Sequence, residues 1–123
     1  MPSVVLVVDD EPDVLAALQW GLQGNGCKVY TAASAEEGFR YLQAVHPQLL
    51  LIDFKLPGAP GTEFLKWAKK ADPHVPAIMI TGLSNQFEAI HSICWKLGAF
   101  ACLQKPLRMD EVIQNIRQAL GLA

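Results

Sequence analysis

The sequence predicts a doubly wound α/β fold in which a five-stranded parallel sheet carries helices on both faces. Short apolar runs of strand length alternate five times with segments whose apolar residues recur at helical spacing. The length of 123 residues suits one compact domain, and 51% apolar with 18% charged residues is typical of a globular core. Among the orders open to such a sheet we expect 2-1-3-4-5.

The first half of the chain is expected to hold three strands and two helices. Residues 4–8 are all aliphatic, as in a strand that is buried on both faces of a parallel sheet. The first helix begins near Pro12, which suits a first turn, and ends at the glycines that follow its leucines. Ser34 and Glu37 have the spacing of a capping box and predict the start of the second helix. The other two strands are expected at residues 27–32 and 49–52.

The second half continues the alternation. A loop rich in proline and glycine at residues 57–61 precedes a third helix. The fourth strand is expected at residues 76–80 and the fifth at residues 99–104, with a helix between them that runs through about Leu97. Apolar residues at helical spacing predict a last helix from about residue 110 to 120.

Four of the predicted strands are followed directly by polar or charged side chains. Ligands of open α/β sheets bind outside the carboxyl ends of the strands, so these side chains are expected to converge on one site. One acid after one strand is a weak indication, but two acids, a third acid, a hydroxyl and an ammonium after four strands predict a shared site. In chain order they are Asp9 and Asp10, Asp53, Thr81 and Lys105.

These residue types predict phosphoryl chemistry. Carboxylates held close together repel one another and need a cation, and hard oxygen ligands favour Mg²⁺ over zinc. The carboxylate of Asp53 can act as a nucleophile and form an acyl phosphate. Thr81 can donate a hydrogen bond to a phosphoryl oxygen, and Lys105 can pair with Asp53 before the reaction and with the phosphoryl group after it.

Two acids near the first strand have simpler interpretations. Asp9 has the alternative role of capping the helix that starts at Pro12, and Asp10 is the better ligand candidate of the pair. Glu11 is interpreted as a first-turn residue that interacts with the helix dipole, with no place in the site.

Four segments resemble the motifs of response-regulator receiver domains: VVDDEPDV, LLLIDFKLPGAPG, AIMITG and GAFACLQKP. They occur in the family's order and spacing over essentially the whole chain. The resemblance implies a flavodoxin-like (βα)5 three-layer sandwich that forms a single receiver domain over residues 1–123. It also implies that Asp53 is phosphorylated by a histidine kinase or a phosphotransfer protein.

The resemblance further implies the roles of the site residues. Asp9, Asp10 and Asp53 would bind Mg²⁺ together with the backbone carbonyl of Lys55. Thr81 and Lys105 would contact the phosphoryl group. The peptide bond between Lys105 and Pro106 would be cis.

The same resemblance implies a regulator that assists its own phosphorylation and slow dephosphorylation and is not a turnover enzyme. It would act on a downstream protein or a fused effector domain by altering the surface around the fourth helix and fifth strand, and it allows a phosphorylation-dependent homodimer. No nucleic-acid or membrane partner is expected from a net charge of -2 and apolar runs of strand length only. Three cysteines without a CxxC pair, and no visible signal peptide, favour a reducing cytoplasm.

The sequence departs from the family at three places. Cys102 stands where the family has the aromatic switch residue, and Phe100, expected on the same strand face, is too far from the site to replace it. The segment from Thr81 to Gly98 is about two residues longer than usual. Lys55 and Leu83 fill the positions that flank the attacking water in the family.

Three other functions compete with this interpretation. A phosphohydrolase of the haloacid-dehalogenase type would need Asp-x-Asp after the first strand, where this chain has Asp9 and Glu11 at the two positions. A flavodoxin-type flavin carrier would need a phosphate-binding loop there, and acids repel phosphate. A degenerate receiver that serves only as an interaction module stays open because of Cys102.

Overall fold

The computed structural model describes residues 3–82 and 84–122, and its five strands form one parallel sheet in the order β2-β1-β3-β4-β5, as predicted. The strands are β1 Val4–Val8, β2 Lys28–Ala32, β3 Leu49–Asp53, β4 Ala77–Thr81 and β5 Ala101–Gln104. The helices are α1 Pro12–Gly24, α2 Ala35–Val45, α3 Gly61–Ala71, α4 Phe87–Lys96 and α5 Met109–Ala119, with a 3₁₀ turn, η1, at Ser84–Gln86.

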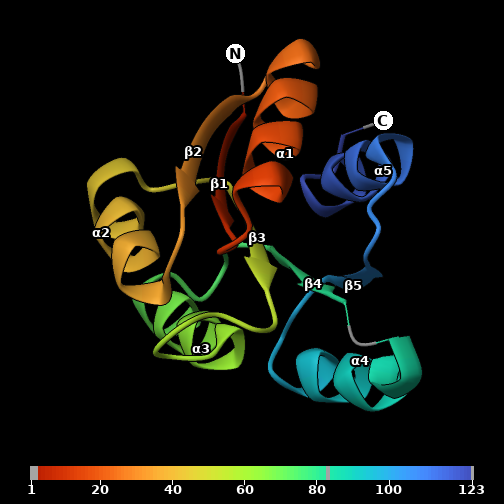
Figure 1. Ribbon diagram of the computed structural model, residues 1–123. Helices are drawn as coiled ribbons and strands as arrows, with labels where there is room; N and C mark the ends of the chain where they lie inside the picture. The colour runs from red at the N-terminus through yellow and green to blue at the C-terminus, as the bar shows by residue number, and fades with distance from the viewer. Residues whose placement is uncertain (1–2, 83, 123) are drawn as a thin grey trace.

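The helices cover both faces of the sheet, with α1 and α5 on one face and α2, α3 and α4 on the other (Figure 1). Successive residues of a strand point to opposite faces, so each inner strand supplies both layers. In β1, Val5 and Val7 pack with the α1 and α5 side, whereas Leu6 and Val8 pack with the other helices. This double burial explains why the strands are unbroken apolar runs.

Two strands begin later than the sequence predicts, because hydrogen bonds at helix ends occupy the backbone first. The N–H of Cys27 donates to the carbonyl of Leu22 at 3.0 Å, so β2 starts after Cys27. In the same way the N–H of Ala99 donates to the carbonyl of Cys94 at 3.0 Å, and β5 starts only at Ala101. Phe100 precedes the strand and is 42% exposed, although its N–H still donates to the carbonyl of Ala77 at 2.7 Å. That Phe100 shares a strand face with Cys102 stays a prediction.

β4 also differs by one residue at each end. It starts at Ala77, after Pro76, whose ring nitrogen carries no hydrogen for the ladder. It extends through Thr81, whose carbonyl accepts a hydrogen bond from the N–H of Lys105 at 2.7 Å. The ladder thus brings the end of β4 and the residue after β5 side by side.

The local signals for α2 are confirmed. The side chain of Ser34 accepts a hydrogen bond from the N–H of Glu37, and the carboxylate of Glu37 accepts one from the N–H of Ala33. The first contact satisfies a backbone donor of the first helical turn, whereas the second lies one residue before the N-cap, where a full capping box would use the N–H of Ser34. None of the helices within the described ranges, 3–82 and 84–122, is long and apolar enough to cross a membrane.

Gly61 holds the connection from β3 to α3 close to the end of β3. Its N–H donates to the carbonyl of Phe54 at 3.0 Å, and its Cα faces the carbonyl group of Asp53. A Cβ at this position would overlap the backbone oxygen of Asp53. Because the obstacle is backbone, no rotamer change relieves the overlap, and a side chain here must displace the loop that follows Asp53.

We expect Gly61→Ala to lower the free energy of unfolding by about 1–3 kcal/mol or more, as overpacking does. The matched control is Gly24→Ala at the end of α1, where an added Cβ meets nothing within 4 Å. That change should be neutral or stabilising by up to about 1 kcal/mol, since alanine favours helix over glycine. Urea unfolding of both variants measures the difference, and equal effects would contradict the proposed overlap.

Candidate functional site

The strand ends meet at one edge of the sheet, as predicted. Asp53 is the last residue of β3 and Thr81 the last residue of β4, while Asp9 follows β1 and Lys105 follows β5. A pocket of about 380 Å³ opens at this edge. It is lined by Asp10, Glu11, Asp53, Lys55, Thr81, Gly82 and Lys105.

Three carboxylates cluster at this edge of the sheet, two of them in the lining of the pocket. Oxygen atoms of Asp9, Asp10 and Asp53 all lie within 4.8 Å of one another. Asp9 is fully buried and Asp53 is 4% exposed, whereas Asp10 is exposed. Such close carboxylates raise one another's energy in their charged forms unless a cation lies among them.

Asp9 joins the site instead of capping α1. One of its oxygens, Oδ1, accepts a hydrogen bond from the N–H of Glu11 at 2.9 Å. The other, Oδ2, is buried, and its partner is the ammonium group of Lys105 at 3.1 Å. A buried carboxylate that lies beside two further carboxylates, and shares one ammonium group with other acids, fits a small hard cation that prefers oxygen ligands.

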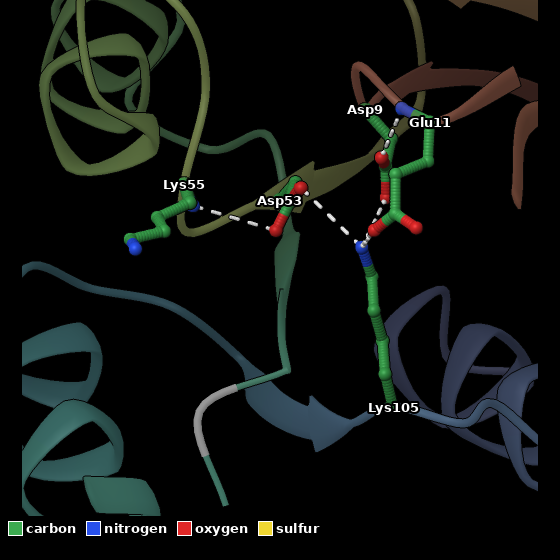
Figure 2. Close-up of polar contacts among 5 residues, drawn as sticks. All are labelled: Asp9, Glu11, Asp53, Lys55 and Lys105. Carbon is green, nitrogen blue, oxygen red and sulfur yellow. Dashed lines mark hydrogen bonds and ion pairs between the residues drawn. The ribbon is translucent and has the colours of Figure 1, made fainter.

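Lys105 is the cation that the chain itself supplies (Figure 2). Its Nζ lies 2.5 Å from Oε1 of Glu11, 3.1 Å from Oδ2 of Asp9 and 3.4 Å from Oδ2 of Asp53. Burial by itself would lower the pKa of this ammonium, but the hydrogen bonds that it donates to Glu11 and Asp9, and the charges of Asp53 and Asp9, raise the pKa above its ordinary value. Lys105 is therefore firmly positively charged at neutral pH.

Glu11 is the site residue that the sequence interpretation missed. It was expected only to interact with the helix dipole, yet it makes the shortest of the three contacts to Lys105. Glu11 is the N-cap residue of α1 and makes no side-chain capping bond, which leaves its carboxylate able to cross to Lys105. The sequence did contain a signal for this role, because Glu11 directly follows Asp9 and Asp10 at the end of the first strand.

The Asp53 carboxyl group has a raised pKa of about 6. Burial is the main cause and the negative charge of Asp9 adds to it, while Lys105 and the backbone N–H of Lys55 act in the opposite direction. Asp53 is therefore ionised at neutral pH but held in an unfavourable environment. A carboxylate of this kind gains from any cation or hydrogen-bond donor that enters the pocket.

Lys55 contributes its backbone and not its side chain. Its N–H lies 3.4 Å from Oδ1 of Asp53, and its side chain points away from that carboxylate (Figure 2). Thr81 is buried at the end of β4 and lines the pocket. The peptide bond between Lys105 and Pro106 is cis, as predicted. Leu83, the other residue expected to flank the attacking water, lies outside the described residues.

Comparison with known proteins gives a consistent result. The family model described as the response regulator receiver domain matches residues 5–117. The nitrogen assimilation regulatory protein NtrX of Azorhizobium caulinodans is 33% identical over 98% of this chain and 26% of its own length. PhoP of Bacillus subtilis, described as the alkaline phosphatase synthesis transcriptional regulatory protein, is 30% identical over 98% of this chain and 49% of its own length.

A solved structure agrees in shape as well as in sequence. The response regulator receiver domain protein from Clostridium thermocellum superposes with a TM-score of 0.90 at 30% identity, covering 97% of this chain and 94% of that one. Against the two regulators, by contrast, the chain spans about a quarter and about half of their length. The likeness to them therefore concerns one part of each regulator.

The raised pKa of Asp53 predicts a specific pH dependence of stability in buffer that contains a chelator. The folded carboxyl group holds its proton up to about pH 6, and the unfolded one only up to about 3.8. Between these values the folded state binds more protons, so rising pH destabilises the wild type, and the penalty is fully present above pH 6. If the whole pKa shift appeared in the free energy of unfolding, the loss of stability would be about 3 kcal/mol. Because water in the open pocket screens the charges, we expect a loss of about 1–2 kcal/mol.

The variant Asp53→Asn lacks this titration and serves as the comparison. Denaturant unfolding at pH 4 and at pH 7.5 should show the wild type losing stability relative to Asp53→Asn as the pH rises. A stability difference that stays constant between the two pH values would contradict the raised pKa.

Proposed function

This chain belongs to the family of response regulator receiver domains, and we propose that it accepts a phosphoryl group on the carboxylate of Asp53. The observation that carries the proposal is the position of Asp53, an ionised and buried carboxylate at the end of β3 that faces a pocket lined by acids, a threonine and a lysine. We propose a histidine kinase or a phosphotransfer protein as the donor.

In the proposed transfer, an oxygen of Asp53 attacks the phosphorus of a phosphohistidine and forms an acyl phosphate. The nitrogen–phosphorus bond breaks, and the imidazole nitrogen keeps the electron pair and takes up a proton. Lys105 exchanges its contact with Asp53 for one with a phosphoryl oxygen, and its ammonium group balances the added negative charge. The proposed role of Thr81 is to donate its hydroxyl hydrogen to another phosphoryl oxygen.

We propose Mg²⁺ as the cation of this site. Asp9, Asp10 and Asp53 supply the crowded carboxylate oxygens, and the backbone carbonyl of Lys55 is the further ligand that we expect. When bound, Mg²⁺ supplies charge neutralisation to both the carboxylates and the incoming phosphoryl group. The buried Asp9 shares the ammonium group of Lys105 with Glu11 and Asp53, and this shared charge supports the assignment of a further cation.

The proposed output is regulatory. Relatives of this chain are named as regulators, and we propose that it controls a downstream protein or a fused effector domain through the surface around α4 and β5. Self-assisted phosphorylation, slow dephosphorylation, a phosphorylation-dependent homodimer and a cytoplasmic location are parts of the same proposal. That residues 1–123 form a single receiver domain stays a prediction.

Cys102 bears on how the output is produced. It is buried in β5 opposite Met79, at the position where the family has an aromatic side chain. A cysteine has no ring to move between an exposed and a buried position. We therefore propose that the surface change at α4 and β5 does not depend on rotation of an aromatic residue at this position.

Phosphorylation is tested first with acetyl phosphate as a small-molecule donor. Intact mass spectrometry should show one added phosphoryl group on the wild type in the presence of Mg²⁺ and none in the presence of a chelator. Asp53→Asn should gain none, because its amide is not a nucleophile. No adduct on the wild type, together with no binding of beryllofluoride, would leave the alternative of an interaction module on a receiver fold.

Mg²⁺ binding is tested by stability and not by activity. Millimolar Mg²⁺ should raise the unfolding temperature of the wild type, since a ligand present at 100 times its dissociation constant stabilises by about 2.7 kcal/mol. Asp10→Asn should lose most of this shift because it removes one of the clustered carboxylates. The control Asp13→Asn changes another acid of the same region, in the first turn of α1 but outside the cluster, and should retain the shift. A wild type that does not respond to Mg²⁺ would contradict the assignment.

A further inference from the structure

The ion pair between Glu11 and Lys105 lies at the boundary between two pockets. Besides the acidic pocket, a second pocket of about 470 Å³ opens between α1 and the segment that leads from β5 into α5. Its lining is mostly apolar, and Asp13 adds one further acid. Glu11 and Lys105 are the two residues that line both pockets, so their contact forms part of the wall that separates them.

The ammonium group of Lys105 is held from two sides. Figure 2 shows Asp53 on one side of the ammonium group, and Glu11 with Asp9 on the other. The oxygen of Glu11 is the closest at 2.5 Å, that of Asp9 lies at 3.1 Å and that of Asp53 at 3.4 Å. An ammonium group has three N–H donors, and three carboxylates already surround this one. A shift of the ammonium group toward a phosphoryl group on Asp53 therefore works against the contact with Glu11.

Glu11 is anchored by its backbone and not by its side chain. Its N–H donates to Oδ1 of Asp9 at 2.9 Å, which fixes the position of its Cα. Its side chain is 58% exposed and makes no capping bond to α1. The carboxylate can therefore leave Lys105 for water without breaking a helix cap. Because water and salt weaken an ion pair with an exposed partner, Glu11 can oppose the shift of Lys105 but cannot prevent it.

We propose that Glu11 is a positioning residue that holds Lys105 in its resting place and releases it when a phosphoryl group occupies Asp53, a role that rests on the proposed phosphoacceptor function. The carboxylate of Glu11 and the phosphoryl group then compete for one ammonium group. Glu11 forms no bond to the reacting atoms and acts only through Lys105. Removing its charge removes the competitor, so the site should bind a phosphoryl group or its analogue more tightly.

The test measures binding of beryllofluoride, an analogue of the phosphoryl group, to the whole folded chain at saturating Mg²⁺. We expect Glu11→Gln to bind it about two- to five-fold more tightly than the wild type, which corresponds to the free energy of one exposed ion pair. The gain should shrink at about 1 M NaCl, because salt screens exposed charges. Fluorine NMR of the bound beryllofluoride measures both affinities.

The matched control is Asp13→Asn. Asp13 lies in the first turn of α1 and lines the second pocket but not the acidic one. This variant removes the same charge from the same region and should keep the wild-type affinity. An equal gain in Asp13→Asn would show an effect of net charge and would overturn the role of the ion pair.

A second measurement needs no phosphoryl analogue. In ¹⁵N-labelled protein without beryllofluoride, the ammonium signal of Lys105 reports its contacts directly and is assigned by its loss in Lys105→Arg. Glu11→Gln should shift this signal, whereas Asp13→Asn should leave it in place. A signal that does not move in Glu11→Gln would contradict the contact itself.

The outcomes separate this role from the phosphoacceptor function. If the wild type binds beryllofluoride and Glu11→Gln binds it equally or more weakly, Glu11 does not restrain Lys105, while phosphoryl acceptance by Asp53 stands. If the wild type binds none, the phosphoacceptor function fails, and the role of Glu11 fails with it.

Discussion

The contact between Lys105 and the acids at the strand ends is the interaction on which the site depends. Four carboxylates lie at this edge of the sheet, three of them in the lining of the pocket, and the ammonium group of Lys105 contacts Asp9, Glu11 and Asp53. Such an arrangement is stable only while a positive charge lies among the acids, since buried charges without partners are costly. The same requirement makes the pocket receptive to a metal ion, and it leaves Asp53 ionised at neutral pH and incompletely neutralised.

The parallel sheet provides the geometry for this interaction. Residues that lie far apart in the chain, such as Asp9, Asp53 and Lys105, meet because their strands run in the same direction and end at the same edge. The packing behind them keeps the edge in place, with β3 buried along its whole length and Gly61 allowing the following loop to return against Asp53. The candidate site therefore lies at the end of a fully buried strand.

The packing around Cys102 differs from that expected of a receiver domain with an aromatic residue at this position. Met79 and Thr81 point to the same face of β4 because they are two residues apart, and Cys102 is paired with Met79. The end of β4 that lines the acidic pocket is therefore continuous with the apolar layer that holds Cys94 and Cys102. The side chains packed between α4 and β5 thus belong to the same apolar layer as Met79, two residues before Thr81 in β4.

The sequence by itself determined the order of the elements along the chain and the position of five candidate site residues at strand ends, because buried parallel strands leave strong local patterns. The strand order 2-1-3-4-5 followed from the orders that such sheets commonly adopt, and the structure confirms it. The sequence did not determine where β2 and β5 begin, since hydrogen bonds from Cys27 and Ala99 back into the preceding helices compete with the sheet. Nor did it place Glu11, whose contact spans from α1 to the end of β5. Contacts between side chains on separate elements depend on three-dimensional distances, which only the tertiary structure decides.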